Sequence, residues 1–522
     1  MWTVSSPYYV TTPIYYVNDV PHIGHSYTTI AADVLARYFR AEGRDVRFLT
    51  GTDEHGIKIF KAAAEKSMEP QQLADEVVTH FQRLWRDLNI SNDDFIRTSE
   101  PRHERRVQNL MQSLREADEI YPGKYEGWYD EGQEGFVPES TARDNDYKSV
   151  IDGRKLVRYA ESSYFFRLGK WVPKLIEHIE AQPGFIRPVA RRNEVLSKLR
   201  QGVDDLCISR TVEKLPWGVA MPNDPSHVVY VWIDALSNYY TALGLPEVGD
   251  EHDSVAAGYW PCDVHLIGKD ILWFHAVYWP CMLMALGIEL PRCVFAHGWW
   301  TSEGRKMSKS LGNFISVEAI RDICREYSCD VYRYFLLRAV AFGSDGDFSW
   351  DMLNQRYNGD LANGVGNLLS RTLNMIGRYF DAAVPQCGEN TQEEEVLVHH
   401  AAGNLHKDAP VAMDKCEFGT YIGRIMELVQ ATNVYIDATQ PFKLAKDPSQ
   451  RERLGTILYT CAEAVRIILL YLHPIMPEAS ERGLVGLGWS IGDAPLSELG
   501  QWGMLPAGTK VQKALPLFPR KT

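Results

Sequence analysis

The first fifty residues carry two hydrophobic patterns in succession. Tyr8–Thr12 is rich in aromatic and β-branched residues, which favours a strand, and residues 13–21 are rich in turn formers. Arg44–Leu49 is a second strand-like run. Between them, in His25–Ala41, apolar or small residues recur at helical spacing, at Ile30, Ala31, Val34, Leu35 and Tyr38. This order predicts a βαβ unit, and therefore an α/β fold with a doubly wound parallel sheet.

The sheet pattern is interrupted after the second strand. Residues 71–118 have helical spacing, residues 121–158 are aromatic and glycine-rich with short β-prone pieces, and residues 166–222 are largely helical. Strand-like runs then return at 227–233, 264–267 and 292–297. The sequence therefore predicts a parallel sheet whose two halves are separated by an inserted module.

From Asp351 to about Gly483 every apolar pattern is helical, which predicts a separate all-α bundle. The predicted units are the first half of the sheet at 1–116, the inserted module at 117–226, the second half of the sheet at 227–350, and the bundle with a C-terminal tail at 351–522.

The composition is that of an ordinary globular protein. Of the 522 residues, 45% are hydrophobic and 24% are charged. The longest apolar run, Ile467–Leu472, is too short to cross a membrane, and residues 1–3 lack the start of a secretory signal. The nine cysteines include no pair with CxxC spacing. We therefore expect neither a structural zinc site nor a disulfide framework, and we expect a cytoplasmic location.

The formal net charge of −13 would by itself disfavour nucleic acid as a partner. Phosphate affinity, however, depends on local basic patches rather than on total charge. Basic residues do cluster, in segments 187–192, 305–309, 321–338 and 510–521. Each cluster alone is most often a solvated surface, so charge neither establishes nor excludes a nucleic-acid partner.

The turn His22-Ile23-Gly24-His25 lies where the first predicted strand gives way to the helix. A helix N-terminus offers unpaired backbone N–H groups and the positive end of the helix dipole. The two imidazoles add donors, and Gly24 lets a ligand approach the backbone closely. The sequence therefore predicts a phosphate site here. The Asp53–His55 loop should face the same crevice, because it also follows a strand of the parallel sheet.

A second cationic stretch is Lys306-Met307-Ser308-Lys309-Ser310, which glycines flank on both sides. Two lysines three residues apart in such a loop form a mobile clamp for a pyrophosphate or triphosphate whose charge rises during displacement. Lysines at this spacing usually mark only a surface loop. This stretch is informative because the histidine turn lies at the opposite end of the same predicted split sheet.

The histidine turn and the lysine loop together resemble the two signatures of class I aminoacyl-tRNA synthetases. The finer sequence resembles the methionyl-tRNA synthetase family over essentially the whole chain, also in segments 12–18, 230–235 and 268–279. The resemblance implies a Rossmann-type catalytic domain, split by an inserted module and followed by an anticodon-binding bundle. It also implies the reaction. Methionine and ATP give methionyl-adenylate and pyrophosphate, and the methionyl group then passes to the 3′-terminal adenosine of tRNA(Met).

The resemblance assigns the ATP-binding residues. It implies that His22, His25, Lys306 and Lys309 hold the phosphates while charge builds up during attack on the α-phosphorus. It implies that Asp270 accepts hydrogen bonds from ribose hydroxyls and that Mg²⁺ enters with ATP. The remaining implied ATP contacts come from Gly24, Gly268, Lys269, Met307 and Ser308.

The methionine-binding residues follow from the same resemblance. Tyr16 and His275 can donate toward the weakly accepting sulfur, and Asp53 can meet the ammonium group. Aromatic surface suits a thioether. His55 could contact a ligand or hold its loop, and the sequence leaves both readings open. The implied pocket consists of Ile14, Tyr16, Asp53, Trp232, Ala235, Leu236, Tyr239, Ile271, Phe274, His275 and Trp279. The insertion is too short for a hydrolytic editing domain, so homocysteine should be rejected in or near this pocket.

The predicted bundle carries three residues implied to read the anticodon of tRNA(Met). Asn367 and Arg371 are four residues apart and share one helical face. Phe442 stands where the family usually has a tryptophan. A phenylalanine still stacks on a base, but it lacks the indole N–H.

The inserted module departs from many relatives, which carry zinc-binding cysteine pairs there. Asp130 and Gln133 stand at the place of such a pair, and without thiolates a tetrahedral zinc site is not expected. We expect a zinc-free module held by the packing of Tyr125, Trp128, Tyr129, Phe136 and Tyr147. Because the chain ends at Thr522, without the dimerising appendix of some relatives, we expect a monomer. We expect no membrane association.

Three other functions fit part of the pattern. A cysteinyl enzyme of the same class would need a thiolate-bound zinc, and the cysteines are not clustered. A tRNA-binding protein without catalysis would have no reason to keep His22, His25, Lys306 and Lys309. A small nucleotidylyltransferase shares the HxGH turn, but not the length or the helical bundle.

Overall fold

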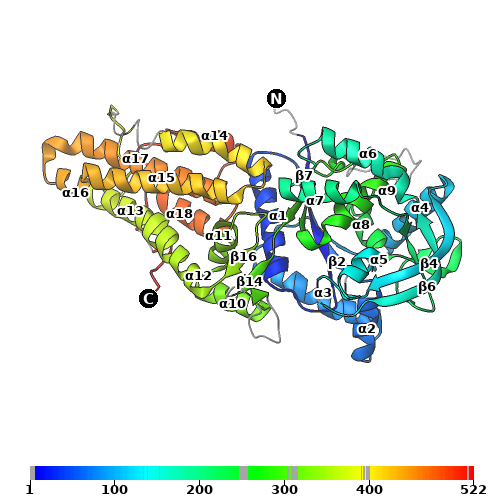
Figure 1. Cartoon of the computed structure of the whole chain (residues 1–522). Helices are drawn as coiled ribbons and strands as arrows, with labels where there is room; N and C mark the ends of the chain where they lie inside the picture. The colour runs from blue at the N-terminus through cyan, green and yellow to red at the C-terminus, as the bar shows by residue number, and fades with distance from the viewer. Residues whose placement is uncertain are drawn as a thin grey trace.

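The computed structural model of the chain describes residues 6–132, 134–137, 139–151, 153–245, 257–302, 305–306, 315–389, 391, 394, 400–513 and 516–521. Figure 1 shows an α/β region built from residues of the first two thirds of the chain and an elongated helical bundle beside it.

The α/β region is centred on a six-stranded parallel sheet. The strands β1 (Tyr8–Tyr16) and β12 (Val264–Gly268) are neighbours, with Val10 opposite Val264, and the strand order reverses direction at this pair. Open α/β sheets bind ligands beyond the carboxyl ends of the strands at such a point. The predicted doubly wound sheet is therefore confirmed. Its order is β3 (Asp94–Arg97), β2 (Val46–Asp53), β1 (Tyr8–Tyr16), β12 (Val264–Gly268), β13 (Val294–His297) and β7 (Ile186–Arg187).

Side chains along the strands alternate between two hydrophobic cores. Tyr8 and Val10 belong to the core that contains α1 (Ile23–Ala41) and α3 (Pro70–Asp87), whereas Tyr9 belongs to the opposite core. This is the two-residue period of a strand. The second core is built with α4 (Pro101–Glu116), α6 (Leu168–Ala181), α8 (Val231–Thr241) and α9 (Trp279–Ala285).

The first strand is longer than its sequence suggests. The pattern predicts an end at Thr12, because Pro13 has no N–H to give to a ladder. The structure carries β1 across the proline with an irregular register between Thr11 and Ile14, and the strand continues to Tyr16. This extension places Ile14 and Tyr16 at the carboxyl edge of the sheet.

The prediction differs from the structure at one strand that it misplaces and at two short strands that it misses. Residues 227–233 were expected to extend the parallel sheet, and this is wrong. β11 (Asp224–Val229) pairs with β9 (Ser209–Thr211) and β10 (Ala220–Met221) in a small antiparallel sheet, and α8 begins at Val231. The prediction misses β3 and β7, which have four and two residues, because so few residues show no alternation. β7 lies inside the range 117–226 and yet joins the central sheet. The domain limits stay a prediction.

The inserted segment forms an antiparallel sheet, and the expected aromatic packing in it is confirmed. Ring centroids are 4.4 Å apart for Tyr125 and Phe136, 4.7 Å for Trp128 and Tyr147, and 5.3 Å for Tyr129 and Phe136. The elements are β5 (Gly135–Val137), β4 (Ile120–Asp130), β6 (Val157–Phe166) and β8 (Leu206–Cys207), with α5 (Glu139–Asp144) and α7 (Val189–Leu199).

Arg210 is a buried cation inside this module that the sequence did not reveal. Its guanidinium lies 4.1 Å from the ring centre of Tyr129 and 4.7 Å from that of Tyr159, and it pairs with the Glu161 carboxylate. The charge is thus shared between an ion pair and aromatic faces.

The second half of the α/β region leads into the bundle. The bundle holds mainly helices, as predicted, and α17 (Arg451–Leu472) is buried within it from Leu454 onward. After β13 come β14 (Trp300–Ser302), β15 (Arg305–Lys306), α10 (Val317–Glu326), α11 (Cys329–Ala339), β16 (Gly346–Phe348) and α12 (Trp350–Arg356). The bundle then contains a π-helical stretch (Tyr357–Gly366), α13 (Asn367–Tyr379), α14 (His400–Asp414), α15 (Phe418–Thr439), α16 (Pro441–Leu444), α17 (Arg451–Leu472), α18 (Pro477–Leu487) and α19 (Leu496–Leu499).

One stretch of the described chain, 448–472, is long and apolar enough to cross a membrane by length and composition alone. All of its most apolar window is buried against the other helices. The stretch also carries the buried ion pair between Glu463 and Arg466, at 2.6 Å. These are properties of the central helix of a bundle.

A buried ion pair fastens the bundle to the sheet. Arg333 of α11 contacts Asp33 of α1 at 2.6 Å, and both side chains are fully buried. The same guanidinium donates to the carbonyls of Pro474 and Ile475, in the turn between α17 and α18. The helix that begins at the histidine turn is therefore fixed to the bundle.

Candidate active site

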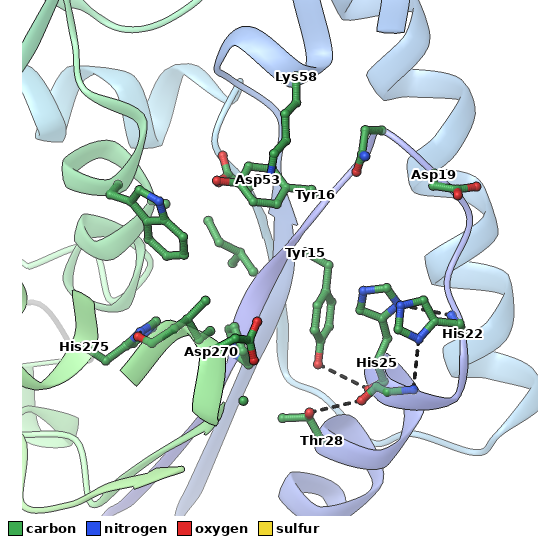
Figure 2. Close-up of a pocket in the computed structure, with 18 of the residues that line it drawn as sticks. Tyr15, Tyr16, Asp19, His22, His25, Thr28, Asp53, Lys58, Asp270 and His275 are labelled. Carbon is green, nitrogen blue, oxygen red and sulfur yellow. Dashed lines mark hydrogen bonds between the residues drawn. The ribbon is translucent and has the colours of Figure 1, made fainter. Parts of the chain in front are cut away.

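A cavity of about 580 Å³ opens at the carboxyl edge of the sheet, beside the N-terminus of α1. Figure 2 shows side chains from the two halves of the sheet facing each other across it. The sequence-predicted residues that line this cavity are Ile14, Tyr16, His22, Gly24, His25, Asp53, Trp232, Ala235, Leu236, Tyr239, Gly268, Asp270, Ile271 and His275.

The histidine turn caps α1 through its own imidazoles. The N–H of Gly24 donates to His22 Nδ1 at 3.0 Å, and the N–H of His22 donates to His25 Nδ1 at 3.1 Å. A backbone N–H can only donate, so both Nδ1 atoms are acceptors and each neutral ring carries its proton on Nε2. The sequence predicts that the two imidazoles are donors here, and the structure adds that the donating atom of each ring is Nε2.

His25 is neutral in this arrangement. Burial holds the pKa of His25 well below its ordinary value, and the neighbouring His22 acts in the same direction. Tyr15 packs against the His25 ring with centroids 4.8 Å apart. The imidazole is therefore a rigid neutral donor, which needs no proton from solvent to bind an anion.

The aromatic wall of the cavity is formed by α8 and the end of β1. Trp232 is perpendicular to Tyr16, with ring centroids 6.3 Å apart, and stacks on Phe274 at 3.8 Å. Phe274 lies behind Trp232 and is not among the residues that line the cavity. Trp279 is fully buried behind Tyr239 and also does not line it. These two predicted pocket residues support the wall from behind.

His275 differs from its predicted donor role. Its Nδ1 donates to the carbonyl of Ile271 at 3.0 Å, and its Nε2 lies 2.6 Å from the hydroxyl of Tyr239. Burial lowers the pKa of His275 to about 4, so the ring is neutral and Nε2 accepts a hydrogen bond from the Tyr239 hydroxyl. His275 thus has no ring N–H left for a sulfur atom. Its expected role as donor is corrected to that of an acceptor that orients Tyr239.

Asp53 is a nearly buried carboxylate at the end of β2. Only 2% of its surface is exposed, and Oδ1 has no hydrogen-bond partner among the described residues. Burial raises the pKa of Asp53 well above its ordinary value, the carboxylates of Asp234 and Glu134 add to this, and Lys58 opposes it. A cation that enters the cavity therefore stabilises the ionised form of Asp53.

His55 holds its loop and does not line the cavity. Its Nδ1 contacts Asp234 Oδ2 at 2.7 Å, and the same carboxylate contacts His103 Nε2 at 2.8 Å. Of the two readings left open by the sequence, the structure supports the structural one.

The segment after β12 supplies the far wall. Gly268 and Asp270 line the cavity, and Asp270 Oδ1 accepts from Trp299 Nε1 at 3.0 Å. Lys269 does not line it. Its Nζ contacts both oxygens of Asp345 at 2.7 Å and lies 4.4 Å from the ring centre of Trp299.

The predicted lysine loop lies mostly outside the described residues. Met307, Ser308 and Lys309 are not described. For Lys306 the backbone is placed, opposite Thr301 in the β14–β15 ladder. The roles expected for these residues stay predictions.

The predicted anticodon residues lie on the bundle. Asn367 is the first residue of α13 and is exposed, and Arg371 is one turn further on. Arg371 contacts Asp437 of α15 at 2.9 Å. Phe442, at the start of α16, is 46% exposed, which is unusual for a large apolar side chain. Figure 1 places α16 at the end of the bundle that is remote from the sheet.

Several cavity residues were missed by the sequence reasoning. Thr28 Oγ1 in the second turn of α1 lies 2.6 Å from His297 Nε2 at the end of β13, and Lys58 Nζ lies 4.2 Å from the ring centre of Tyr16. Each comes from a different element, so no local motif links them. One available signal was position, because Thr28 lies one helical turn after Gly24 and His297 lies at the end of a predicted strand. The missed lining residues are Pro13, Tyr15, Asn18, Asp19, Val20, Thr28, Lys58, Gly132, His297 and Trp299.

Comparison with known proteins gives consistent matches along the chain. Residues 8–145 and 140–373 match the family of tRNA synthetases class I (M), and residues 398–484 match the anticodon-binding domain of tRNA ligase. The chain is 47% identical to a methionine–tRNA ligase of Caldanaerobacter subterraneus over 98% of this chain and 78% of that protein. It is 43% identical to that of Rickettsia felis over 99% of both. A Mycobacterium tuberculosis methionyl-tRNA synthetase solved with methionyl-adenylate has 41% identity and a TM-score of 0.92, over 99% of this chain and all of that one.

Proposed function

The chain belongs to the methionine–tRNA ligases of class I, and from this premise we propose how its residues divide the work. The reaction has two steps. Methionine and ATP give methionyl-adenylate and pyrophosphate, and the methionyl group is then transferred to the 3′-terminal adenosine of tRNA(Met). The observation that carries the assignment is one cavity, lined by the histidine turn on one side and by an aromatic wall with a buried carboxylate on the other.

In the first step the methionine carboxylate attacks the α-phosphorus of ATP and pyrophosphate leaves. No covalent enzyme intermediate is required, so catalysis rests on positioning and on stabilising charge. We propose that His22 and His25 donate from Nε2 to phosphate oxygens, while the N-terminus of α1 adds its dipole. Lys306 and Lys309 would approach the same phosphates from the other side.

Methionine is held at the other end of the cavity. Asp53 meets the ammonium group, which relieves the cost of its own burial. Trp232, Leu236 and Tyr239 surround the side chain, and sulfur–aromatic contacts are worth roughly 0.3–1.5 kcal/mol each. The Tyr16 hydroxyl is buried and interacts with the Glu134 carboxylate, and we propose that it donates toward the sulfur when methionine binds.

ATP contacts continue on the far wall. Asp270 keeps acceptor capacity beside its bond from Trp299, which suits ribose hydroxyls. Gly24 and Gly268 leave room for the side chains that we expect to face the nucleotide, because a Cβ would lie 2.9 Å from His22 Cε1 and 2.5 Å from Asp270 Oδ1, respectively. We propose that Lys269 contributes indirectly, since its charge is paired with Asp345.

We propose that tRNA(Met) is recognised on the bundle by Asn367, Arg371 and Phe442. The exposed aromatic ring of Phe442 offers a stacking surface for an unpaired base. Monomeric state, cytoplasmic location and the absence of membrane association stay predictions. Light scattering of the purified protein tests the first of them.

We propose that Mg²⁺ enters as part of the ATP complex and that the inserted module folds without zinc. Among the described residues no group of three or more His, Cys, Asp and Glu side chains could hold a metal ion. Asp130, at a position of the cysteine pair, accepts the N–H of Gly132 at 2.8 Å, while Gln133 is outside the described residues. Elemental analysis of active protein, before and after EDTA treatment, tests this. Zinc bound at one equivalent would contradict it.

Pyrophosphate exchange into ATP with each of the twenty amino acids tests the function as a whole. We expect exchange that depends on methionine, without added zinc, and that collapses in His25→Ala and Lys309→Ala. Exchange driven by another amino acid would overturn the methionine pocket and leave the class I mechanism. Absence of exchange with every amino acid would overturn the catalytic assignment.

A further inference from the structure

Glu134 belongs to the inserted segment, but its carboxylate lies beside the predicted methionine site. It follows the end of β4 in a turn, with φ of 49°, and the residue is fully buried. A buried carboxylate at the tip of a hairpin needs a reason, because burial without partners is costly. The mechanism described above does not use it.

On one side Glu134 caps α2 (Ile57–Glu65). The N–H of Lys58 donates to Glu134 Oε1 at 3.1 Å, and the N-cap residue Gly56 provides no side-chain cap of its own. A Cβ at Gly56 would lie 2.6 Å from Oε1, so the carboxylate sits directly on the helix end. The positive end of the helix dipole favours this placement.

On the other side the Glu134 backbone is tied to α8. The Tyr230 hydroxyl donates to the carbonyl of Glu134 at 2.5 Å, and the ring of Phe136 packs on that of Tyr230 at 5.3 Å. Tyr230 is the N-cap residue of α8, the helix that carries Trp232 and the rest of the aromatic wall. One residue of the insertion thus contacts both halves of the split sheet domain, on either side of the predicted methionine site.

The charges around this contact belong to the same cluster as Asp53. Glu134 Oε2, Asp53 Oδ1 and the Tyr16 hydroxyl make no well-formed hydrogen bond among the described residues, and the Tyr16 hydroxyl interacts with the Glu134 carboxylate. Lys58 is the cation that lowers the pKa of both carboxyl groups, against the burial that raises them. Burial, and then the charges of Glu134 and Asp53, also raise the pKa of Tyr16. Glu134 is therefore coupled to two predicted methionine-binding residues without lining the cavity.

We propose that Glu134 is a positioning residue through which the tip of the inserted module sets the geometry of the amino-acid site. It holds the start of α2, with Lys58, on one side and the start of α8 on the other. The proposal rests on the function proposed above and deepens it, because it assigns the insertion a part in amino-acid binding.

The test uses full-length Glu134→Gln, with Glu131→Gln in the same hairpin as the matched control. Glu131 is partly exposed and pairs with Lys61 on the surface. Pyrophosphate exchange gives KM for methionine and KM for ATP separately. For Glu134→Gln we expect KM for methionine to rise about tenfold, the size of a lost charged hydrogen bond, with KM for ATP nearly unchanged and Tm lowered by the weaker cap on α2. The control should match the parent in all three.

The pH dependence supplies a second readout. The charged groups that face Asp53 are Asp234 on α8, Glu134 on the insertion and Lys58 on α2. Removing the Glu134 charge stabilises ionised Asp53, so the acid limb of the methionine KM profile should move to lower pH in Glu134→Gln. A merely structural role for Glu134 would not move this limb.

A third variant covers the case in which Glu134→Gln does not fold. Tyr230→Phe removes only the donor to the Glu134 carbonyl, and we expect a smaller rise in KM for methionine alone. Equal changes in both KM values, or no change in either, would overturn the proposal. Failure of the parent protein to exchange with methionine would instead overturn the proposed function, so the two failures are distinguishable.

Discussion

His55 Nδ1 lies 2.7 Å from Asp234 Oδ2, and both side chains are buried directly behind the predicted amino-acid site. His103 Nε2 contacts the other oxygen of the same carboxylate at 2.8 Å. The contact joins the loop after β2 to α8, so it links the two halves of the split sheet domain. Burial alone would lower the pKa of His55, but the Asp234 carboxylate reverses this and raises it.

The His55–Asp234 pair should contribute stability that depends on pH. A histidine whose pKa is higher in the folded than in the unfolded protein stabilises the fold. This contribution is complete below the pKa of the unfolded protein, near 6.5, and is lost as pH rises through the pKa of the folded protein. We expect the Tm difference between the parent and His55→Asn to be largest near pH 6 and to shrink above pH 7. Scanning calorimetry across pH 5.5–9 measures it. A difference that grows with pH would contradict the assignment.

His22→Ala and His25→Ala should slow methionine activation without weakening methionine binding. Each change removes a hydrogen-bond donor that the fold holds in place for the ATP phosphates before the reaction. The loss of one such donor costs a factor of about 10²–10³ in kcat. Pyrophosphate exchange at saturating ATP measures kcat and KM for methionine. Because burial keeps His25 neutral, the parent kcat should show no loss between pH 6 and 8 from titration of this group. A loss of kcat in this pH range that disappears in His25→Asn would show that His25 titrates there, and would contradict its assignment as a neutral donor.

Tyr16→Phe should distinguish methionine from norleucine, which has the same shape but no sulfur. In the proposed mode the Tyr16 hydroxyl donates to sulfur, and its loss should raise KM for methionine by about three- to tenfold. KM for norleucine should stay the same, because its CH₂ group accepts no hydrogen bond. Equal effects on the two substrates would show that the hydroxyl acts on the shape of the pocket.

Asp437→Asn should strengthen tRNA binding, whereas Arg371→Ala should weaken it. Arg371 is paired with Asp437 and must exchange this partner before it contacts an anticodon base. An exposed pair is worth about 0–1 kcal/mol, so we expect Kd for tRNA(Met) to fall up to about fivefold in Asp437→Asn. Fluorescence anisotropy measures the change.

The matched control for this pair is Glu427→Gln on the same helix, which removes a surface charge that contacts Arg424. If both acidic variants bind tRNA equally more tightly, the effect is one of general charge. If neither variant changes the Kd for tRNA(Met), the contact with Asp437 does not limit the binding of Arg371 to the tRNA.

The first βαβ unit was predictable because its pattern is long and local. The stripe of α1 and the histidine turn lie within twenty residues of sequence, and the structure reproduces their order. In contrast, β3 and β7 are too short to show a period, and their place in the sheet depends on partners far along the chain. Residues 227–233 were misassigned because a short apolar run suits a buried strand and a buried helix equally well.

The residues that line the cavity were predictable where a motif carried them and not where packing assembled them. Thr28, Lys58 and His297 come from three elements and meet only in the folded chain. The donor role expected of His275 failed for a related reason. Its imidazole was available on chemical grounds, but its partners, the Ile271 carbonyl and the Tyr239 hydroxyl, are visible only in three dimensions.

The adjacency of β1 and β12 has a consequence for protein synthesis. Thr11 and His265, which face each other at the centre of the sheet, are 254 residues apart. At about 5–20 residues per second, the ribosome needs roughly 13–50 s to deliver the second strand after the first. During this interval the nascent β1–α1–β2 unit has an open strand edge at what will become the middle of the sheet. That edge is the point at which chaperone capture or mispairing competes with folding.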